Sequence, residues 1–491
     1  MKAPAAWLRR LCAGSIIGLG LALLPVGAAA DDATITCSGT AVVLCTGHTT
    51  EEESGLTANF KMEKPADWNG TLVLYSHGYA FGASPLRDVG DPVTGAWLLS
   101  HGYALAGSSY ARSGWALQQA FEDQIAVLGV FNDTFGRPAR TIAWGHSLGG
   151  MITAGLIQRN PHRFTAALPM CGVLAGGPGV WNQGLDSEFA FLTLQAPGAF
   201  KLANFTDRAD AADNFGKALA VFGAAQVDAK GRAHIALAAA LADVPGWFDP
   251  TKPEPAATDY AARLANQQAW NFNPDLYFGF FGRQELEARA GGNVSWNTGV
   301  DYHAQLAHST QRDEVMALYA AAGLNLDAEL NKLNATPRIA ADPEAVKYLS
   351  KYIAYNGDID MPVLTLHTTG DGLVEVTDEP AYASVVASAG NSSLLRQTFV
   401  HRAGHCTFSP AETITAFQTL VHRIDTGQWS GTDASAMNTQ AATLGASGNF
   451  IFVGDPVTLF PVAPSFITYT PGQFLRPFNA RNHGNEGDSG D

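Results

Sequence analysis

The sequence predicts an α/β fold in which a mostly parallel sheet is covered by helices on both faces and carries a large, mainly helical cap insertion. Short apolar, β-rich runs alternate with segments of helical periodicity from about residue 71. The alternation stops after about residue 175 and resumes near residue 357, and strand-like runs are scarce in between. Strands and helices in short alternation imply parallel pairing through right-handed crossovers, so one sheet with one insertion explains the pattern.

Composition and charge limit the class of protein. Hydrophobic residues make up 46% of the chain and charged residues 15%, which favours a large globular core over disorder. The formal net charge is −15, which argues against nucleic acid or an anionic membrane surface as the main partner.

The first 30 residues have the pattern of a secretory signal peptide. A basic start is followed by an apolar stretch and by small residues just before Asp31. The alternative is an uncleaved membrane anchor, but the apolar stretch is short for a span. No later run is long and apolar enough to cross a bilayer. We therefore expect a secreted or periplasmic protein without an integral membrane segment once the signal is removed.

The expected elements of the first core part follow one another closely. TLVLYSHG and GYALAGSSYA are predicted as strands, and SGWALQQAFEDQIAVLGVFNDTFG as a helix that Ser113 could cap. A strand in RTIAW, a tight turn, a helix in MITAGLIQRN and a strand in FTAALPM complete this part.

The later elements divide the rest of the chain. RAHIALAAALADV and RDEVMALYAAAGLNLDAELNKL are helical patterns of the insertion, and MPVLTLHTTGD and SLLRQTFVH are strands, each followed by a helix pattern. The final residues, RNHGNEGDSGD, are expected to be disordered. We predict a signal peptide over 1–30, core parts over 31–175 and 357–428, a cap over 176–356 and a C-terminal extension over 429–491.

The turn TIAWGHSLGG places Ser147 between Gly145 and Gly149. A serine is a poor nucleophile until a base removes its proton and its oxygen is presented freely. On a tight strand-to-helix turn the nucleophile has a strained backbone, and side chains at the flanking positions would collide with the adjoining strand and helix. G-x-S-x-G between an apolar strand and a helix therefore predicts a nucleophile elbow at Ser147.

The remaining catalytic groups are expected at the ends of later strands. Asp371, in GDGLVEV after an apolar run, is the predicted acid, and we interpret Glu375 and Asp378 as ordinary solvated charges. His405, in HRAGHCTFSP, is the predicted base, and its rival His401 is interpreted as a structural hydrogen-bonding residue. The i, i+4 spacing of the two histidines could indicate metal, but no HExxH pattern supports it, so no metal is predicted.

A second requirement is a pair of backbone N–H groups that stabilise an oxyanion. The helix that follows Ser147 begins at Leu148, and the loop after the strand LVLYS contains His77, Gly78 and Tyr79. We expect the N–H groups of Tyr79 and Leu148 to form the oxyanion hole.

These four motifs, HGY after a strand, GHSLGG, GDGLVEV and AGHCTF, resemble the α/β-hydrolase superfamily, and most of all its secreted bacterial esterases and lipases. The resemblance covers about residues 70–175 and 357–426. It implies acyl transfer in which Ser147 attacks an ester carbonyl, His405 moves the proton and Asp371 orients the imidazole. It implies a small-molecule or polymeric ester as substrate and no metal or organic cofactor.

Four cysteines follow the predicted signal peptide, and an even number in an exported protein indicates two disulfides. Three pairings are possible; closeness in sequence favours Cys37 with Cys45, leaving Cys171 with Cys406. Tannase and feruloyl esterase relatives bridge cysteines beside both serine and histidine, whereas here His146 precedes the serine. A bridge from Cys171 to Cys406 would still tether the histidine loop near the serine.

Aromatic residues are dense in the insertion, as in WNFNPDLYFGFFG. These rings either cover an apolar substrate pocket or form the core of the cap itself; they are Trp270, Phe272, Tyr277, Phe278, Phe280 and Phe281. Two other functions remain open. One is an exported serine peptidase of the prolyl-oligopeptidase kind, although no propeller blade repeat is visible. The other is a non-catalytic binding protein on a hydrolase fold.

Overall fold

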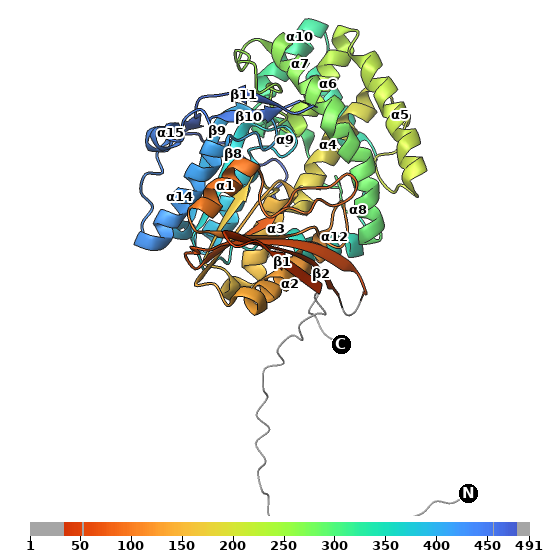
Figure 1. The fold of residues 1–491 in the computed structure, drawn as a ribbon. Helices are drawn as coiled ribbons and strands as arrows, with labels where there is room; N and C mark the ends of the chain where they lie inside the picture. The colour runs from red at the N-terminus through yellow and green to blue at the C-terminus, as the bar shows by residue number, and fades with distance from the viewer. Residues whose placement is uncertain (1–33, 52–53, 455, 479–491) are drawn as a thin grey trace, which may run out of the picture.

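The computed structural model describes residues 34–478, apart from 52–53 and 455 (Figure 1). The predicted signal peptide and the expected disordered end lie outside the described residues.

A ten-stranded sheet forms the centre of the molecule, in the order β1-β2-β3-β5-β4-β6-β7-β8-β9-β12. The six strands from β5 to β9 in this order are parallel, and β1, β2, β3 and β12 pair antiparallel at the two edges. The strands are β1 (Thr34–Ser38), β2 (Val42–Thr50), β3 (Thr57–Pro65), β4 (Thr71–Ser76), β5 (Ala104–Ser108), β6 (Arg140–His146), β7 (Ala166–Met170), β8 (Val363–Gly370), β9 (Leu395–Ala403) and β12 (Phe466–Ile467). The predicted fold class is confirmed.

Helices cover both faces because each parallel strand presents apolar side chains on both sides. The buried residues of the first face come from α2 (Leu117–Phe135), α3 (Leu148–Arg159), α12 (Pro343–Ile353) and α13 (Asp378–Ser388). Those of the second face come from α1 (Pro92–Ser100), α14 (Pro410–Thr426) and α15 (Ala434–Ala442). Short 3-10 turns η1 (Pro161–Arg163) and η4 (Ser392–Leu394) precede β7 and β9.

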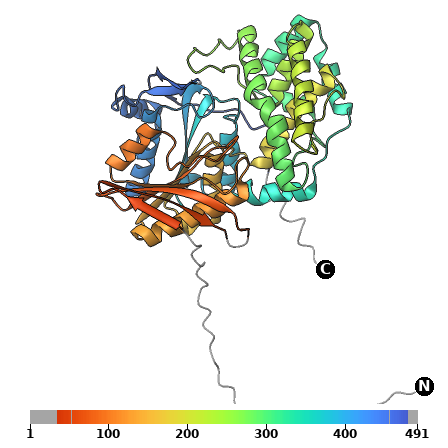
Figure 2. The ribbon, with the colours of Figure 1, turned by 45° about the vertical axis from the view of Figure 1, so that its right-hand side comes forward.

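The segment between β7 and β8 is helical, and most of it packs around a hydrophobic core of its own (Figure 2). Two of its segments, η2 and η3, are π-helical. The elements before α12 are α4 (Gly177–Gln195), α5 (Arg208–Ala225), α6 (Ala229–Leu241), α7 (Tyr260–Trp270), η2 (Asn271–Asp275), η3 (Phe278–Gly282), α8 (Arg283–Ala290), α9 (Tyr302–His308), α10 (Arg312–Ala322) and α11 (Leu326–Ala335).

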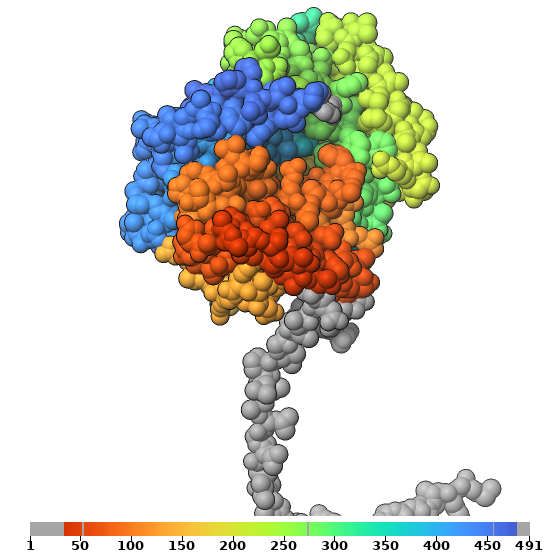
Figure 3. Space-filling view, viewed as in Figure 1, coloured from red at the N-terminus to blue at the C-terminus, as the bar shows by residue number. Residues whose placement is uncertain are grey.

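The C-terminal segment joins the two parts of the molecule. A hairpin of β10 (Phe450–Val453) and β11 (Thr458–Pro461) precedes β12, which pairs with β9. Figure 3 shows this segment, in blue, lying across one face of the molecule. Further on, Arg476 forms an ion pair with buried Asp186 of α4, and the Leu475 N–H donates to Gln183. Because this segment contacts both β9 of the sheet and α4 of the insertion, it holds the two together.

Two features differ from the sequence-based expectations. No strand was predicted before residue 71, yet β1–β3 extend the sheet there; their side chains are largely exposed or half-buried, so they lack the apolar run that marks a core strand. Ser113 does not cap α2: the helix begins after Ala116 without a side-chain cap, and the Ser113 carbonyl accepts a hydrogen bond from Arg289 instead. Among the described residues no helix is long and apolar enough to cross a membrane.

Candidate active site

The turn between β6 and α3 has the geometry that its glycines predict. Ser147 has φ 59° and ψ −124°, a strained conformation for a residue with a side chain. A Cβ at Gly145 would lie 2.5 Å from the Gly149 and Ser76 carbonyl oxygens, and one at Gly149 would lie 1.9 Å from that of Ser76. Residues with a side chain are therefore excluded at Gly145 and Gly149, and the half-buried Ser147 lies at the carboxyl end of the sheet.

Three residues predicted from separate motifs are brought together at this edge. His405 Nε2 lies 2.7 Å from Ser147 Oγ, and His405 Nδ1 lies 2.7 Å from Asp371 Oδ2. The other oxygen of Asp371 accepts the N–H groups of Leu373 and Val374, both at 3.1 Å. The carboxylate is thus held by its own loop and faces the imidazole.

The histidine loop is fixed by a disulfide. The structure contains bonds from Cys37 to Cys45 and from Cys171 to Cys406, which is the pairing that sequence proximity favours. Cys171 directly follows β7 and Cys406 directly follows His405, so the second bond ties the loop to the strand next to the elbow.

The interpretation of Glu375 and Asp378 as solvated charges is wrong. Asp378 is fully buried and accepts the Ala175 N–H at 2.9 Å; burial raises its pKa to about 7, although that hydrogen bond opposes the shift. Glu375 is 8% exposed, and burial together with the charge of Asp378 raises its pKa well above the usual range. Both side chains are buried because α13, which Asp378 begins, packs against the sheet, and the insertion covers Glu375.

A buried histidine lies behind the acid. His367 of β8 is 3.8 Å from Asp371 and 3.2 Å from Glu379, and its Nε2 lies 2.9 Å from the Val374 carbonyl. Burial would lower the pKa of His367, but the hydrogen bond and charge of Glu379, with the charge of Asp371, outweigh it and raise that pKa to about 9. The imidazolium therefore places a positive charge between the buried side chains of Asp371 and Glu379.

His146, the residue before Ser147, lies outside this chain of contacts. His146 lies 3.3 Å from the Tyr75 hydroxyl, and burial followed by the charge of His405 lowers its pKa to about 4. A neutral imidazole therefore packs beneath the elbow. His401, the rival base, is far less enclosed; it lies 3.5 Å from Glu254 at the surface and takes no part in the hydrogen bonds of Ser147.

The loop expected to form the oxyanion hole lies beside the serine. A Cβ at Gly78 would be 3.8 Å from Ser147 Oγ, so the loop backbone closely approaches this hydroxyl. Tyr79 and Leu148 both line the cavity into which Ser147 opens.

That cavity has a volume of about 180 Å³ and separates the sheet edge from the insertion. An apolar cavity of about 150 Å³ holds a benzene molecule, so this one suffices for an aromatic ring or a short acyl chain. Its apolar wall includes Tyr79, Trp115, Val173, Trp181, Phe191 and Phe278.

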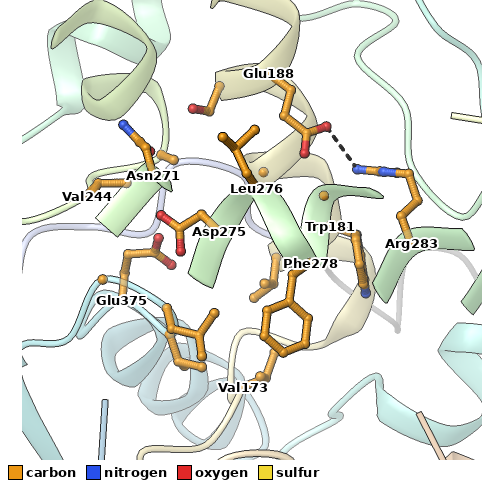
Figure 4. A pocket seen from close by; sticks show the side chains of 18 of the residues that line it. Val173, Trp181, Glu188, Val244, Asn271, Asp275, Leu276, Phe278, Arg283 and Glu375 are labelled. Carbon is orange, nitrogen blue, oxygen red and sulfur yellow. Dashed lines mark ion pairs between the residues drawn. The ribbon is translucent and has the colours of Figure 1, made fainter. Parts of the chain in front are cut away.

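Four charged groups interrupt this apolar wall (Figure 4). Arg283 lies 3.6 Å from Glu188, and burial raises the pKa of Glu188 to about 7 although Arg283 opposes the shift. Asp275 and Glu375 also line the cavity, and burial followed by the charge of Asp371 raises the pKa of Asp275 well above its usual range.

Sequence reasoning missed Glu188, Asp275 and Arg283 as site residues. The available signal was a charge within an aromatic run, since Asp275 stands in WNFNPDLYFGFFG and Arg283 directly follows it. Of the six rings singled out there, Phe278 lines the cavity and Phe280 is buried in the core of the insertion. Phe272 is 52% exposed. Phe278 therefore fits the interpretation as a pocket-lining ring, and Phe280 fits the interpretation as part of the core of the cap.

Comparison with known proteins points to hydrolases. The model of the prolyl oligopeptidase family matches residues 97–175. An o-phthalyl amidase from Xanthobacter agilis is 26% identical over 442 residues, which cover 80% of this chain and 91% of that protein.

Solved structures with similarity to the chain include several esterases. An esterase from Aspergillus oryzae has a TM-score of 0.43 at 12% identity, covering 89% of both chains. The feruloyl esterase B of the same organism has a TM-score of 0.41 at 10% identity, covering 92% of this chain and 96% of that one. The cell wall degrading esterase LipA from Xanthomonas oryzae has a TM-score of 0.35 at 15% identity, covering 78% and 90%.

The matching family model spans the elbow, and the elbow stands between β6 and α3 of a mostly parallel sheet. The chain is a member of the α/β-hydrolase superfamily and a serine hydrolase of that fold.

Proposed function

We propose that the protein is a secreted or periplasmic serine esterase that acts through Ser147, His405 and Asp371. The observation that carries this proposal is the continuous chain of hydrogen-bond contacts from Asp371 through His405 to Ser147 at the mouth of an apolar cavity. Export is supported by the two disulfides, which persist in oxidising compartments.

In the proposed mechanism Ser147 Oγ attacks the carbonyl carbon while His405 Nε2 takes its proton. Asp371 stabilises the imidazolium that forms, and the N–H groups of Tyr79 and Leu148 donate to the oxyanion. His405 then gives the proton to the leaving alcohol, and water releases the acid from the acyl-enzyme by the same steps. Leu148 begins α3, so the N-terminal dipole of that helix also favours the negative oxygen.

The cavity supports a substrate with a small or aromatic acyl group. Its volume of about 180 Å³ fits one ring, whereas a palmitoyl chain would have to extend beyond it. We therefore expect kcat/KM to be highest for acetyl to hexanoyl or benzoyl esters.

An amidase activity is the second candidate, because the Xanthobacter agilis relative is named for the hydrolysis of an amide. The same three residues serve both reactions, but an amine is a poorer leaving group, so amide hydrolysis depends more strongly on protonation by His405.

The test is hydrolysis of p-nitrophenyl esters from acetyl to palmitoyl and of matched p-nitroanilides by wild type and Ser147→Ala. We expect ester turnover that falls by about 10⁴-fold or more in the variant. A preference for the anilides would favour the amidase. If the variant is as active as the wild type, the assigned nucleophile is wrong, and if neither turns over any substrate, the proposed function fails.

A further inference from the structure

Two carboxyl groups in the cavity wall receive no hydrogen bond from any other residue that the structure describes. Figure 4 shows the carboxyl groups of Asp275 and Glu375 directed toward one another. Oδ2 of Asp275 is buried and, among the described residues, has no hydrogen-bond partner. Glu375 is 8% exposed and lines the same cavity. Its carboxylate accepts a hydrogen bond from its own backbone N–H and, within the described part of the chain, from no other residue.

The guanidinium group of Arg283 in the cavity wall already has partners other than Asp275 and Glu375. Arg283 is the only Lys, Arg or His among the cavity-lining residues that the structure describes. It pairs with Glu188 at 3.6 Å, donates to Ser295 at 2.5 Å and lies 4.9 Å from the ring centroid of Trp181. Arg283 thus directs its contacts to Glu188, Ser295 and Trp181, and among the described residues no ion pair joins it to Asp275 or Glu375.

Such an arrangement favours a cation over a neutral ligand. A buried carboxylate without a partner is costly, and a cation that donates hydrogen bonds to it removes most of that cost. The raised pKa values of both groups have the same origin, since burial and neighbouring carboxylates disfavour their ionised forms. Across the described residues no three His, Cys, Asp or Glu side chains are placed to hold a metal ion. The apolar wall suits an organic cation instead.

The backbone around Asp275 is also unusual. Asp275 ends the π-helical segment η2, which contains Pro274. A proline inside a helix lacks an N–H and collides with the carbonyl four residues earlier, and a wider π turn relieves both problems. Single π turns occur often at functional sites, and here the turn places a carboxyl group on the cavity wall.

On the basis of the proposed function, we propose that the cavity contains a subsite for a protonated amine. The ammonium group of the substrate donates hydrogen bonds to Asp275 and Glu375, and its hydrocarbon part packs against the apolar wall near Phe278. Because Ser147 opens into the same cavity, one substrate molecule can occupy both sites. The substrate class is therefore an ester or amide that carries an amino group.

The test compares three ligands of nearly equal shape: benzylamine, benzyl alcohol and benzoate. Their inhibition constants are measured against hydrolysis of p-nitrophenyl acetate by the full chain at pH 7.5, where benzylamine is protonated. We expect benzylamine to bind at least about tenfold more tightly than benzyl alcohol, and benzoate to bind most weakly. In Glu375→Gln and Asp275→Asn, which keep the side-chain shapes, the preference for benzylamine falls to about threefold or less.

A matched control is Glu344→Gln, whose side chain is 82% exposed on α12 and which should leave both the preference and the esterase activity unchanged. Tighter binding of benzoate would overturn the proposal in favour of an anion site at Arg283. Equal binding of benzylamine and benzyl alcohol would overturn it as well. If p-nitrophenyl acetate is not hydrolysed, the proposed function has failed separately, and calorimetric titration of benzylamine into wild type and Glu375→Gln still decides whether the subsite exists.

Discussion

Two buried acids beside the sheet, Asp371 after β8 and Glu412 on α14, differ from the acids of the cavity wall in how fully they are paired. Asp371 accepts three hydrogen bonds, and Glu412 forms two with Arg402, at 2.6 and 2.9 Å. By contrast, Asp275 and Glu188 each have a buried carboxylate oxygen with no hydrogen-bond partner in the described part of the chain. Asp371 and Glu412 hold a fixed geometry, whereas Asp275 and Glu188 retain the capacity to accept further hydrogen bonds.

The largest effect is expected where a fully paired acid holds the base. In Asp371→Asn an amide replaces the carboxylate that accepts the Nδ1–H group of His405. The imidazole then adopts the wrong tautomer, and we expect kcat to fall by about 10⁴-fold. Steady-state kinetics on a p-nitrophenyl ester measures this loss. The matched control is Asp378→Asn, a buried acid that contacts Ala175 rather than His405 and should retain most of the activity. An equal loss in the control would show that buried charge, and not the contact with His405, is responsible.

Removing the partner of the fully paired Glu412 on α14 should reduce stability strongly. Arg402→Ala leaves Glu412 buried without its counter-charge, and we expect the free energy of unfolding to fall by about 3–5 kcal/mol. Urea denaturation measures the change. The double variant Arg402→Met with Glu412→Gln removes both charges and should lose less; a single variant that costs under about 1 kcal/mol would contradict the comparison.

The poorly paired Glu188 should instead make the folded protein less stable as the pH rises. Burial raises its folded-state pKa to about 7, above the unfolded value of 4.5, so its contribution to stability is complete below about pH 4.5 and is lost as the pH rises to about 7. Glu188→Gln has no such loss. The unfolding free energy of the variant minus that of the wild type should therefore increase by roughly 3 kcal/mol between pH 4.5 and 7. A difference that stays constant or decreases over this range would mean that Arg283 pairs with Glu188 fully.

The smallest effect is expected at an exposed pair. Arg140 and Asp425 form an ion pair at the surface, with side chains 39% and 49% exposed. Solvent screens such pairs, so Arg140→Gln should change the free energy of unfolding by less than about 1 kcal/mol. Thermal unfolding at low and high salt measures this change in free energy. A change larger than about 1 kcal/mol would show that an ion pair stabilises this protein strongly even without burial.

The predictable part of the molecule is the part with a strong local pattern. The parallel strands are recognisable as apolar runs because both of their faces are buried. G-x-S-x-G marks the elbow because only glycine fits at positions 145 and 149. The strands β1–β3 escaped prediction because most of their side chains are exposed or half-buried, so they lack the apolar run of a core strand. Glu375 was misread because its burial depends on the insertion that closes over it.

The sequence by itself determined the α/β fold, the position of the elbow and the residues that the proposed mechanism requires, because each leaves a short-range signature in residue type and spacing. Only the tertiary structure decided which acids share the cavity. Glu188 lies on α4, Asp275 on η2 and Glu375 in the loop after β8. They meet in one cavity because the insertion folds back over the carboxyl edge of the sheet. Burial and missing partners are properties of that long-range packing, and no local pattern encodes them.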